Sequence, residues 1–151
     1  MSFEEKINNL IKEAMKAKER ERLEALRAIK SAILLERTKE GATGELTEED
    51  FLKMISKMVK QRDDSAEIYR QQNRPELAEK EEFEASVIRE FLPKQLTVQE
   101  VESHIKAIIA KTGAQSMKDM GKVMSQATAE LAGKAESKTI AEITKRILSG
   151  S

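Results

Sequence analysis

Apolar residues recur every three or four positions along most of the chain, which is the pattern of helices that bury one face. The first stretch predicts a helix from about Ser2 to Ala17, because Ser2 can cap the helix and two glutamates follow it. A second stripe follows the charged stretch 18–22 and ends at the segment Gly41–Gly44. The predicted buried positions are Phe3, Ile7, Leu10, Ile11, Ala14 and Met15, then Leu23, Leu26, Ile29, Ile33 and Leu34.

The middle of the chain predicts two further helices that meet near Asn73. Thr47 is the expected cap of the first helix, and Pro75 fits the first turn of the second. Charged residues interrupt both apolar seams. The seams are Phe51, Ile55, Met58, Arg62, Ser65 and Tyr69 in the first helix, and Leu77, Glu81, Glu84, Ile88 and Phe91 in the second.

A helical hairpin folded at Asn73 explains these charged positions. Arg62 and Glu84 are each eleven residues from the turn, so the hairpin brings them to the same level. We expect Arg62 to reach Glu84, or Glu81 one turn away, in a partly buried bidentate ion pair. Such a pair is interpreted as structural, fixing the register of the hairpin more than adding stability.

Pro93 marks the predicted domain boundary, because a helix usually stops before a proline. It divides the chain into an N-terminal helical bundle, residues 1–92, and a C-terminal three-helix bundle, residues 93–151. The predicted fold class is therefore all-α, a four-helix bundle followed by a smaller three-helix bundle.

Local signals delimit the three C-terminal helices. Thr97 and Glu100 form a predicted capping box, and Gly113 closes that helix. Ser116 with Asp119 starts the next helix, Gly133 ends it, and Ser137 is the expected cap of the last. The predicted buried stripes are Val101, Ile105, Ile108 and Ile109, then Met117, Met120, Met124, Ala127 and Leu131, then Ile140, Ile143 and Ile147.

Composition agrees with helices and narrows the function. Of the 151 residues, 39% are hydrophobic, 36% are charged and 3% are aromatic, which suits helices with wide solvated faces. The chain has no cysteine, which excludes disulfides and thiolate chemistry, and it has no apolar run long enough to span a membrane. We expect a cytoplasmic protein.

The sequence carries no catalytic or metal-binding pattern. His104 is the only histidine, so no His/Cys ligand set or Ser-His-Asp triad can be assembled. The acidic residues alternate with Lys and Arg at helical offsets, as on a solvated face. The chain has no phosphate-binding P-loop, because Gly41 and Gly44 are not followed by the Lys-Ser/Thr pair of that motif. We therefore predict no catalytic residue, no metal and no cofactor.

Charge is unevenly distributed although the formal net charge is zero. Residues 1–92 hold 18 Lys/Arg and 21 Asp/Glu, whereas residues 93–151 hold 9 and 6. Such a basic region can bind a phosphate backbone by shape and charge. Glycines at 121 and 133 would let another backbone approach closely, and the amides at the helix start near Ser137 would attract phosphate. The alternative is that the basic residues only make the surface soluble. The clustered cations are Lys118, Lys122, Lys134, Lys138, Lys145 and Arg146.

Several short stretches occur in an order that resembles the GatB/YqeY family, and in particular stand-alone YqeY-like proteins. The resemblance covers essentially the whole chain. The stretches are Lys60-Gln61-Arg62-Asp63-Asp64-Ser65, Asn73-Arg74-Pro75-Glu76-Leu77-Ala78, Phe91-Leu92-Pro93-Lys94-Gln95-Leu96, Asp119-Met120-Gly121-Lys122-Val123-Met124 and Gly133-Lys134-Ala135.

The resemblance implies the two bundles predicted above and a link to transfer RNA. A similar module forms the C-terminal part of the B subunit of the glutamine-dependent aspartyl/glutamyl-tRNA amidotransferase, where it contacts the tRNA body, and another is appended to some glutaminyl-tRNA synthetases. By this resemblance Gly121, Lys122, Gly133 and Lys134 match the C-terminal motif and are expected to contact RNA. Arg62, Arg74 and Pro93 match the N-terminal motif and are interpreted as structural.

We therefore expect a tRNA-binding or tRNA-metabolism-associated protein without an active site of its own. Two alternatives remain: a protein–protein adaptor for an aminoacyl-tRNA synthetase or amidotransferase, and a family-inherited carbon–nitrogen ligase that uses glutamine as amido-N-donor. Nothing in the chain corresponds to the amidase subunit or the catalytic domain of the amidotransferase. The expected RNA contacts are Gly121, Lys122, Gly133, Lys134, Lys138, Lys145 and Arg146.

Overall fold

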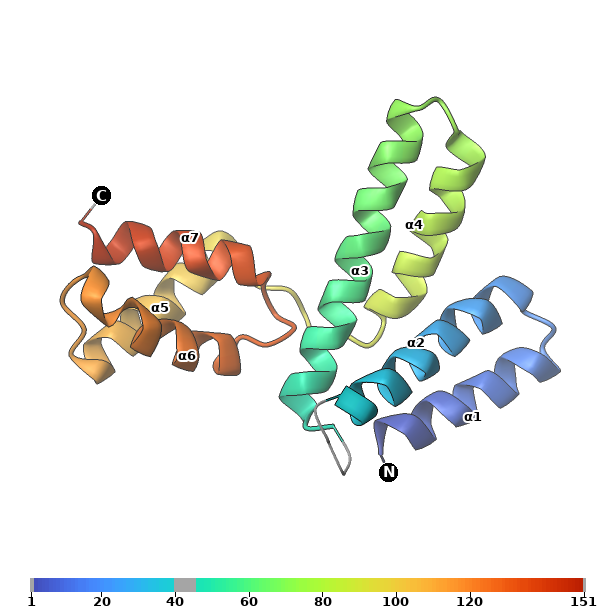
Figure 1. Ribbon diagram of the computed structural model, residues 1–151, viewed down its shortest axis with the longest axis horizontal. Coiled ribbons are helices and arrows are strands. Elements are labelled where there is room, and N and C mark those ends of the chain that lie inside the picture. Colours follow the sequence, from blue (N-terminus) through green and yellow to red (C-terminus); the bar gives the residue numbers. More distant parts are fainter. Residues whose placement is uncertain (1, 40–45, 151) are drawn as a thin grey trace. The chain divides into compact units, whose positions relative to one another are not determined.

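The computed structural model describes residues 2–39 and 46–150, and every regular element in these residues is helical (Figure 1). The all-helical prediction is confirmed for this part of the chain. The predicted end of the second helix at Gly41–Gly44 lies outside the described residues. The elements are α1 (Phe3–Lys16), α2 (Arg20–Thr38), α3 (Glu48–Gln71), α4 (Pro75–Arg89), α5 (Val98–Thr112), the short 3-10 helix η2 (Met117–Asp119), α6 (Met120–Glu130) and α7 (Ser137–Leu148).

Packing divides the chain into two compact units, Met1–Leu92 and Pro93–Ser151, here called unit 1 and unit 2. Unit 1 contains α1 to α4, and unit 2 contains α5 to α7. No helix in the described residues is both long enough and apolar enough to cross a membrane.

Unit 1 consists of two helical hairpins, α1–α2 and α3–α4, which meet mainly through α2 and α4. The two hairpins cross rather than run in parallel (Figure 1). Ser2 and Thr47 cap α1 and α3 as predicted, accepting hydrogen bonds from the backbone N–H of Glu5 (3.1 Å) and Asp50 (3.0 Å). Pro75 is in the first turn of α4, so the local signals in the sequence place these helix starts correctly.

Aromatic packing joins the two hairpins around Phe51, which is 2% exposed. Phe3 of α1 stacks on Phe51 of α3 with ring centroids 4.0 Å apart, and Phe91 meets Phe51 edge-on at 6.5 Å. Two predicted core residues are instead exposed: Met15 at 54% and Leu34 at 45%. Both are at the margin of their apolar stripe, where a small rotation of the helix turns a side chain to solvent.

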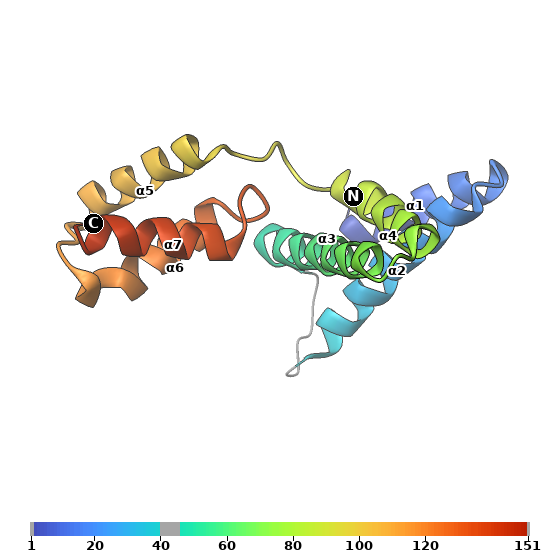
Figure 2. The same ribbon diagram turned by 90° about the horizontal axis from the view of Figure 1, so that it is seen from above.

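Unit 2 is a three-helix bundle in which each of α5, α6 and α7 packs on the other two (Figure 2). The predicted capping box of α5 is present, with Thr97 and Glu100 accepting each other's backbone N–H at 3.1 and 3.0 Å. Gly113 ends α5 with a left-handed φ of 72°, as expected of a glycine after the last turn. The core is formed by Val101, Ile105, Ile108, Val123, Ala127, Leu131, Ile140, Ile143 and Leu148.

Two predictions for unit 2 were wrong. Met117 was expected in the core but is 41% exposed, and Val123 is fully buried. Met117 leaves the stripe because it lies in η2, where three residues per turn replace the α-helical period, whereas Val123 lies one turn before Ala127 on the predicted face of α6 and was left out of the stripe. The N-cap of α7 is Glu136 rather than Ser137, and no side chain caps that helix.

Candidate nucleic-acid interface

The predicted RNA-binding residues of α7 lie on its solvent face. Ile140, Ile143, Thr144 and Leu148 form the buried face of this helix. Lys138 and Lys145 are exposed on the opposite side, seven residues apart, so their Cα atoms are separated by about 10 Å along the helix axis. Neither lysine has an ion pair recorded among the described residues, and the exposed Glu142 lies between them without one. Two unpaired cations therefore project from one helix face.

The N-terminal end of α7 adds partial positive charge next to Lys138, whereas Lys145 lies in the last turn. No side chain accepts a hydrogen bond from its first-turn amides, and no acidic residue occurs within the first turn. The backbone N–H groups at a helix start carry the positive end of the helix dipole and attract anions. The first-turn amides of α7 are thus not capped by a side chain, while the exposed carboxylate of the N-cap residue Glu136 lies beside them and partly offsets their positive charge.

Lys134 lies in the turn that leads into α7, and its side chain is exposed without a recorded ion pair in the described residues. The neighbouring Gly133 is buried and has a φ of 74°. Its carbonyl accepts a hydrogen bond from Gln95 Nε2 at 2.6 Å. Gly133 is thus in contact with the chain's own segment 93–96, through the side chain of Gln95.

Gly121 and Lys122 lie in the first turn of α6. Lys122 Nζ donates a hydrogen bond to the carbonyl oxygen of Thr112 at 3.1 Å, so it covers the C-terminal end of α5, where cations are favoured. A Cβ built on Gly121 meets no atom within 4 Å. Gly121 therefore leaves open space at the surface, and Lys122 is held by α5.

Arg146 is compensated by a carboxylate. Its Nη2 lies 3.0 Å from Glu102 Oε2, and Glu102 also pairs with Lys106 at 3.1 Å. The hydrogen bond from Lys106, together with the charges of Lys106 and Arg146, lowers the pKa of Glu102. The cations predicted to contact RNA consequently fall into three groups: Lys134, Lys138 and Lys145 along α7 and its entry turn, Lys122 at the end of α5, and Arg146 beside Glu102.

The predicted structural ion pair in unit 1 has a different geometry. Arg62 Nε lies 3.9 Å from Glu84 Oε2, and both side chains are less than one-fifth exposed. The contact is single and longer than a hydrogen bond, not bidentate, because Arg62 Nη1 turns back to the Met58 carbonyl at 3.3 Å. No contact with Glu81 is recorded in the described part of the chain. Arg62 Nε is buried without a hydrogen-bond partner.

A bidentate arginine pair does occur in unit 1, but between two residues that no sequence pattern had connected. Arg22 Nη1 and Nη2 donate to the two carboxylate oxygens of Glu90 at 2.8 and 3.2 Å. These residues are 68 positions apart, so no helical spacing connects them. The other two motif residues interpreted as structural are Arg74, which pairs with Glu76 at 2.9 Å, and Pro93, whose carbonyl accepts from Gln95 at 3.0 Å.

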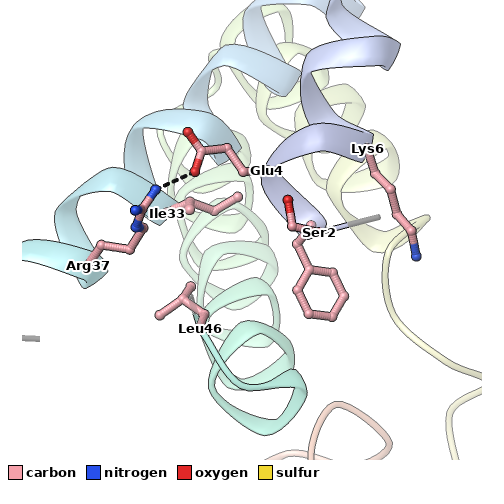
Figure 3. Close-up of a pocket in the computed structure, with 7 residues that line it drawn as sticks. Ser2, Glu4, Lys6, Ile33, Arg37 and Leu46 are labelled. Atoms are coloured by element: carbon pink, nitrogen blue, oxygen red, sulfur yellow. Dashed lines mark hydrogen bonds and ion pairs between the residues drawn. The ribbon is translucent and has the colours of Figure 1, made fainter. Parts of the chain in front are cut away.

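Unit 1 contains a small pocket between α1 and α2, shown in Figure 3. Arg37 points toward Glu4 and donates a hydrogen bond to it at 2.5 Å, while Ile33 and Leu46 contribute apolar walls. Its volume of about 200 Å³ is below the range of roughly 300–1,000 Å³ typical of ligand sites. In the described residues, no cluster of three or more His, Asp or Glu side chains is arranged to hold a metal ion.

Comparison with known proteins identifies the family. The model of the family described as "Yqey-like protein" matches residues 4–148. The "Altered inheritance of mitochondria protein 41, mitochondrial" from Clavispora lusitaniae (strain ATCC 42720) is 39% identical over 82 residues, which is 54% of this chain and 46% of that protein. The chain thus matches less than half of this relative's length. Because the family match extends over nearly the whole sequence, the chain belongs to the family of YqeY-like proteins.

Proposed function

We propose that this chain binds tRNA through unit 2, with Lys134, Lys138 and Lys145 neutralising phosphates of the tRNA body. The observation that carries the proposal is that Lys134 and Lys138, exposed and without an ion pair in the described residues, flank the start of α7, and that Lys145 follows Lys138 on the same helix face in the last turn. Lysine ammonium groups and helix N-termini both bind phosphate. Unit 2 offers no aromatic platform for bases, since it contains no Phe, Tyr or Trp, so binding depends on shape and charge.

Salt dependence tests this proposal directly. Three phosphate contacts release enough counterions for affinity to fall roughly 20- to 40-fold between 50 and 200 mM NaCl. The measurement is a gel-shift titration of the full chain with bulk tRNA at several salt concentrations. Affinity that does not depend on salt, or no binding at 50 mM NaCl, contradicts the proposal.

A charge-reversal variant localises the contact. Lys134→Glu combined with Lys138→Glu is expected to weaken tRNA binding at least tenfold without unfolding the protein, because both side chains are exposed and unpaired. The matched control is Lys57→Glu combined with Lys80→Glu, which reverses two exposed lysines on α3 and α4 of unit 1 and changes the net charge equally. Equal losses from both variants would mean that general charge, and not the α7 surface, controls binding.

The adaptor alternative rests on the acidic excess of unit 1, 21 Asp/Glu against 18 Lys/Arg. Such a surface favours docking to a basic protein such as an aminoacyl-tRNA synthetase or amidotransferase. Retention of that partner after nuclease treatment, together with no direct tRNA binding, supports this alternative over ours. Glutaminase activity of the purified chain would instead support an amido-transfer function.

A further inference from the structure

Segment 93–96, which opens unit 2, packs back on the turn between α6 and α7. Gln95 Nε2 donates to the Gly133 carbonyl at 2.6 Å, and the backbone N–H of Leu96 donates to the Lys134 carbonyl at 2.9 Å. Two consecutive residues of one segment thus bind two consecutive carbonyls of the other. We call this pair of hydrogen bonds the Gln95 clamp.

The clamp fixes the backbone of Lys134. Its N–H donates to the Leu131 carbonyl at 2.9 Å, its own carbonyl accepts from Leu96, and the carbonyl of the preceding peptide accepts from Gln95. Three of the four polar groups in the two peptides that flank its Cα are therefore bound. Residues in turns between helices are usually more mobile than residues within helices, so Lys134 is a turn residue with a backbone restrained as in a helix.

The clamp is anchored in the core of unit 2. Leu96 packs against the buried cluster, while Leu131 and Ala132 on the other side of the contact are buried. Gly133 has a φ of 74° and is itself buried, so the left-handed turn brings its carbonyl to Gln95 without a side chain in the way. The Lys134 side chain, in contrast, is exposed and free to bind.

We propose that Gln95 is a positioning residue for phosphate binding: through the Gly133 carbonyl it orients Lys134 toward a phosphodiester at the start of α7. This inference rests on the proposed function. A phosphate contact requires an ammonium group at a defined place, and each rotatable backbone bond held in advance reduces the entropy lost on binding. Lys138 gains the same advantage from α7 itself, whereas Lys134 depends on the clamp.

The test compares Gln95→Met, Lys134→Gln and the double variant in tRNA titrations across a range of NaCl concentrations. Methionine keeps the length of the side chain but removes the amide donor. Lys134→Gln is expected to reduce the slope of log affinity against log salt by about one phosphate contact. Gln95→Met is expected to weaken binding about two- to fivefold, to reduce the slope in the same direction, and to add nothing in the Lys134→Gln background.

This cycle separates positioning from simple destabilisation. If Gln95 only stabilised unit 2, its loss would weaken binding equally in both backgrounds and leave the salt slope unchanged. The control is Gln99→Met, the same replacement at an exposed position in the first turn of α5. Circular dichroism confirms that each variant is folded, and hydrogen exchange of the Leu96 amide reports whether the clamp has opened.

The outcomes for the two proposals differ. A wild-type chain that binds tRNA, with Gln95→Met showing wild-type affinity and slope, overturns the positioning role but keeps the proposed function. An additive loss in the double variant also overturns it. A wild-type chain that binds no tRNA at 50 mM NaCl overturns both.

Discussion

Units 1 and 2 use their charged residues in opposite ways. In the described residues of unit 1, six of the eight arginines form ion pairs, and five of these pairs join two different helices or, for Arg22, α2 and the residue that follows α4. In unit 2, eight of the nine cations are lysines, and the ion pairs recorded in the described residues involve only Lys106 and Arg146, both with Glu102. The six paired arginines of unit 1 are Arg22, Arg37, Arg62, Arg70, Arg74 and Arg89.

The carboxylates account for part of this difference, since Glu136 and Glu142 of unit 2 are exposed and form no ion pair in the described residues. In unit 2, Glu100 and Asp119 accept backbone N–H groups in capping boxes, so they hold helix starts in place instead of neutralising lysines. In unit 1 the carboxylates of Glu4, Glu84 and Glu90 face arginines from other helices. Arginine suits such fixed pairing because its guanidinium is planar and rigid, whereas lysine is a mobile point charge. Unit 1 thus uses its charges internally, and unit 2 leaves its lysines to solvent.

The largest expected effect that sharpens this comparison comes from Glu84→Gln. Glu84 and Arg62 are 18% and 19% exposed, so removing the carboxylate leaves a mostly buried guanidinium without a counter-charge. We expect a loss of about 1–2 kcal/mol in the free energy of unfolding, less than for a fully buried pair because solvent still reaches both groups. Urea unfolding followed by circular dichroism measures it.

Glu82→Gln is the matched control for this substitution. Glu82 is on the same helix and binds Arg70, but both side chains are about half exposed. Its loss is expected to leave the free energy of unfolding nearly unchanged, because solvent screens an exposed pair. Equal effects of the two substitutions would show that burial does not distinguish the Arg62–Glu84 pair.

The second largest effect is expected from removing a helix cap in unit 2, where carboxylates cap helices instead of pairing with lysines. Thr97→Ala removes the hydroxyl that accepts the Glu100 N–H at 3.1 Å. We expect the free energy of unfolding of unit 2 to fall by about 1 kcal/mol. Faster hydrogen exchange in α5 measures this loss. Ser103→Ala, at an exposed position within the same helix, is expected to leave exchange unchanged or slightly slower. If Ser103→Ala also made exchange faster, the effect of Thr97→Ala would come from losing a hydroxyl anywhere in α5 and not from losing the cap.

What the sequence could predict follows the same division between local and distant contacts. Ser2, Thr47 and Thr97 were identified as caps because a cap depends on residues within one turn. Arg62 and Glu84 were brought together because a hairpin turn at Asn73 relates their positions by simple counting. In each case the residues that determine the contact lie within one helical turn or one hairpin, so the sequence pattern alone identifies them.

The remaining contacts depend on tertiary structure that short-range patterns do not contain. The contact between Gln95 and Gly133 joins residues 38 positions apart, and nothing in the spacing of either motif shows that one binds the other. The pairing of Arg146 with Glu102 likewise follows from how α5 and α7 pack. Sequence therefore gave the cations of the candidate interface but not which of them remain unpaired.

Two glycines in unit 2 provide effects of opposite sign. Gly121 lies in the first turn of α6, and an added Cβ meets no atom within 4 Å. Gly121→Ala is therefore expected to stabilise unit 2 by about 0.5–1 kcal/mol. Gly113→Ala is expected to destabilise it by about 1 kcal/mol, because alanine is strained at a φ of 72°. Thermal unfolding of the two variants and the wild type measures both changes in stability.

The Gly121 substitution also examines the proposed function. If RNA approaches the backbone at Gly121, the alanine variant binds tRNA more weakly although it is more stable. Unchanged affinity would remove Gly121 from the interface while leaving the α7 lysines in it. A destabilised Gly121→Ala variant would contradict the open space that the structure shows.

The smallest expected effect is a pH dependence that distinguishes capping carboxylates from paired ones. Hydrogen bonds from the Gln115 and Ser116 amides lower the pKa of Asp119, and the Thr97 amide does the same for Glu100. A lowered pKa in the folded state means that the unfolded chain binds more protons, so stability rises with pH through this range. The contribution is complete above the ordinary carboxyl pKa of about 4 and is lost as the pH falls through the lowered value.

Asp119→Asn isolates this contribution, because the asparagine oxygen can still accept the two amide hydrogen bonds but does not titrate. The difference in unit 2 stability between wild type and variant is expected to be largest near neutral pH and to shrink as the solution is acidified toward pH 3. Hydrogen exchange of peptides covering η2 and α6, recorded at several pH values and corrected for intrinsic exchange rates, measures it. A difference that stays constant with pH would show that the Asp119 carboxylate does not stabilise the helix start through its charge, and unit 2 would then lose one of the two reasons why its lysines remain unpaired.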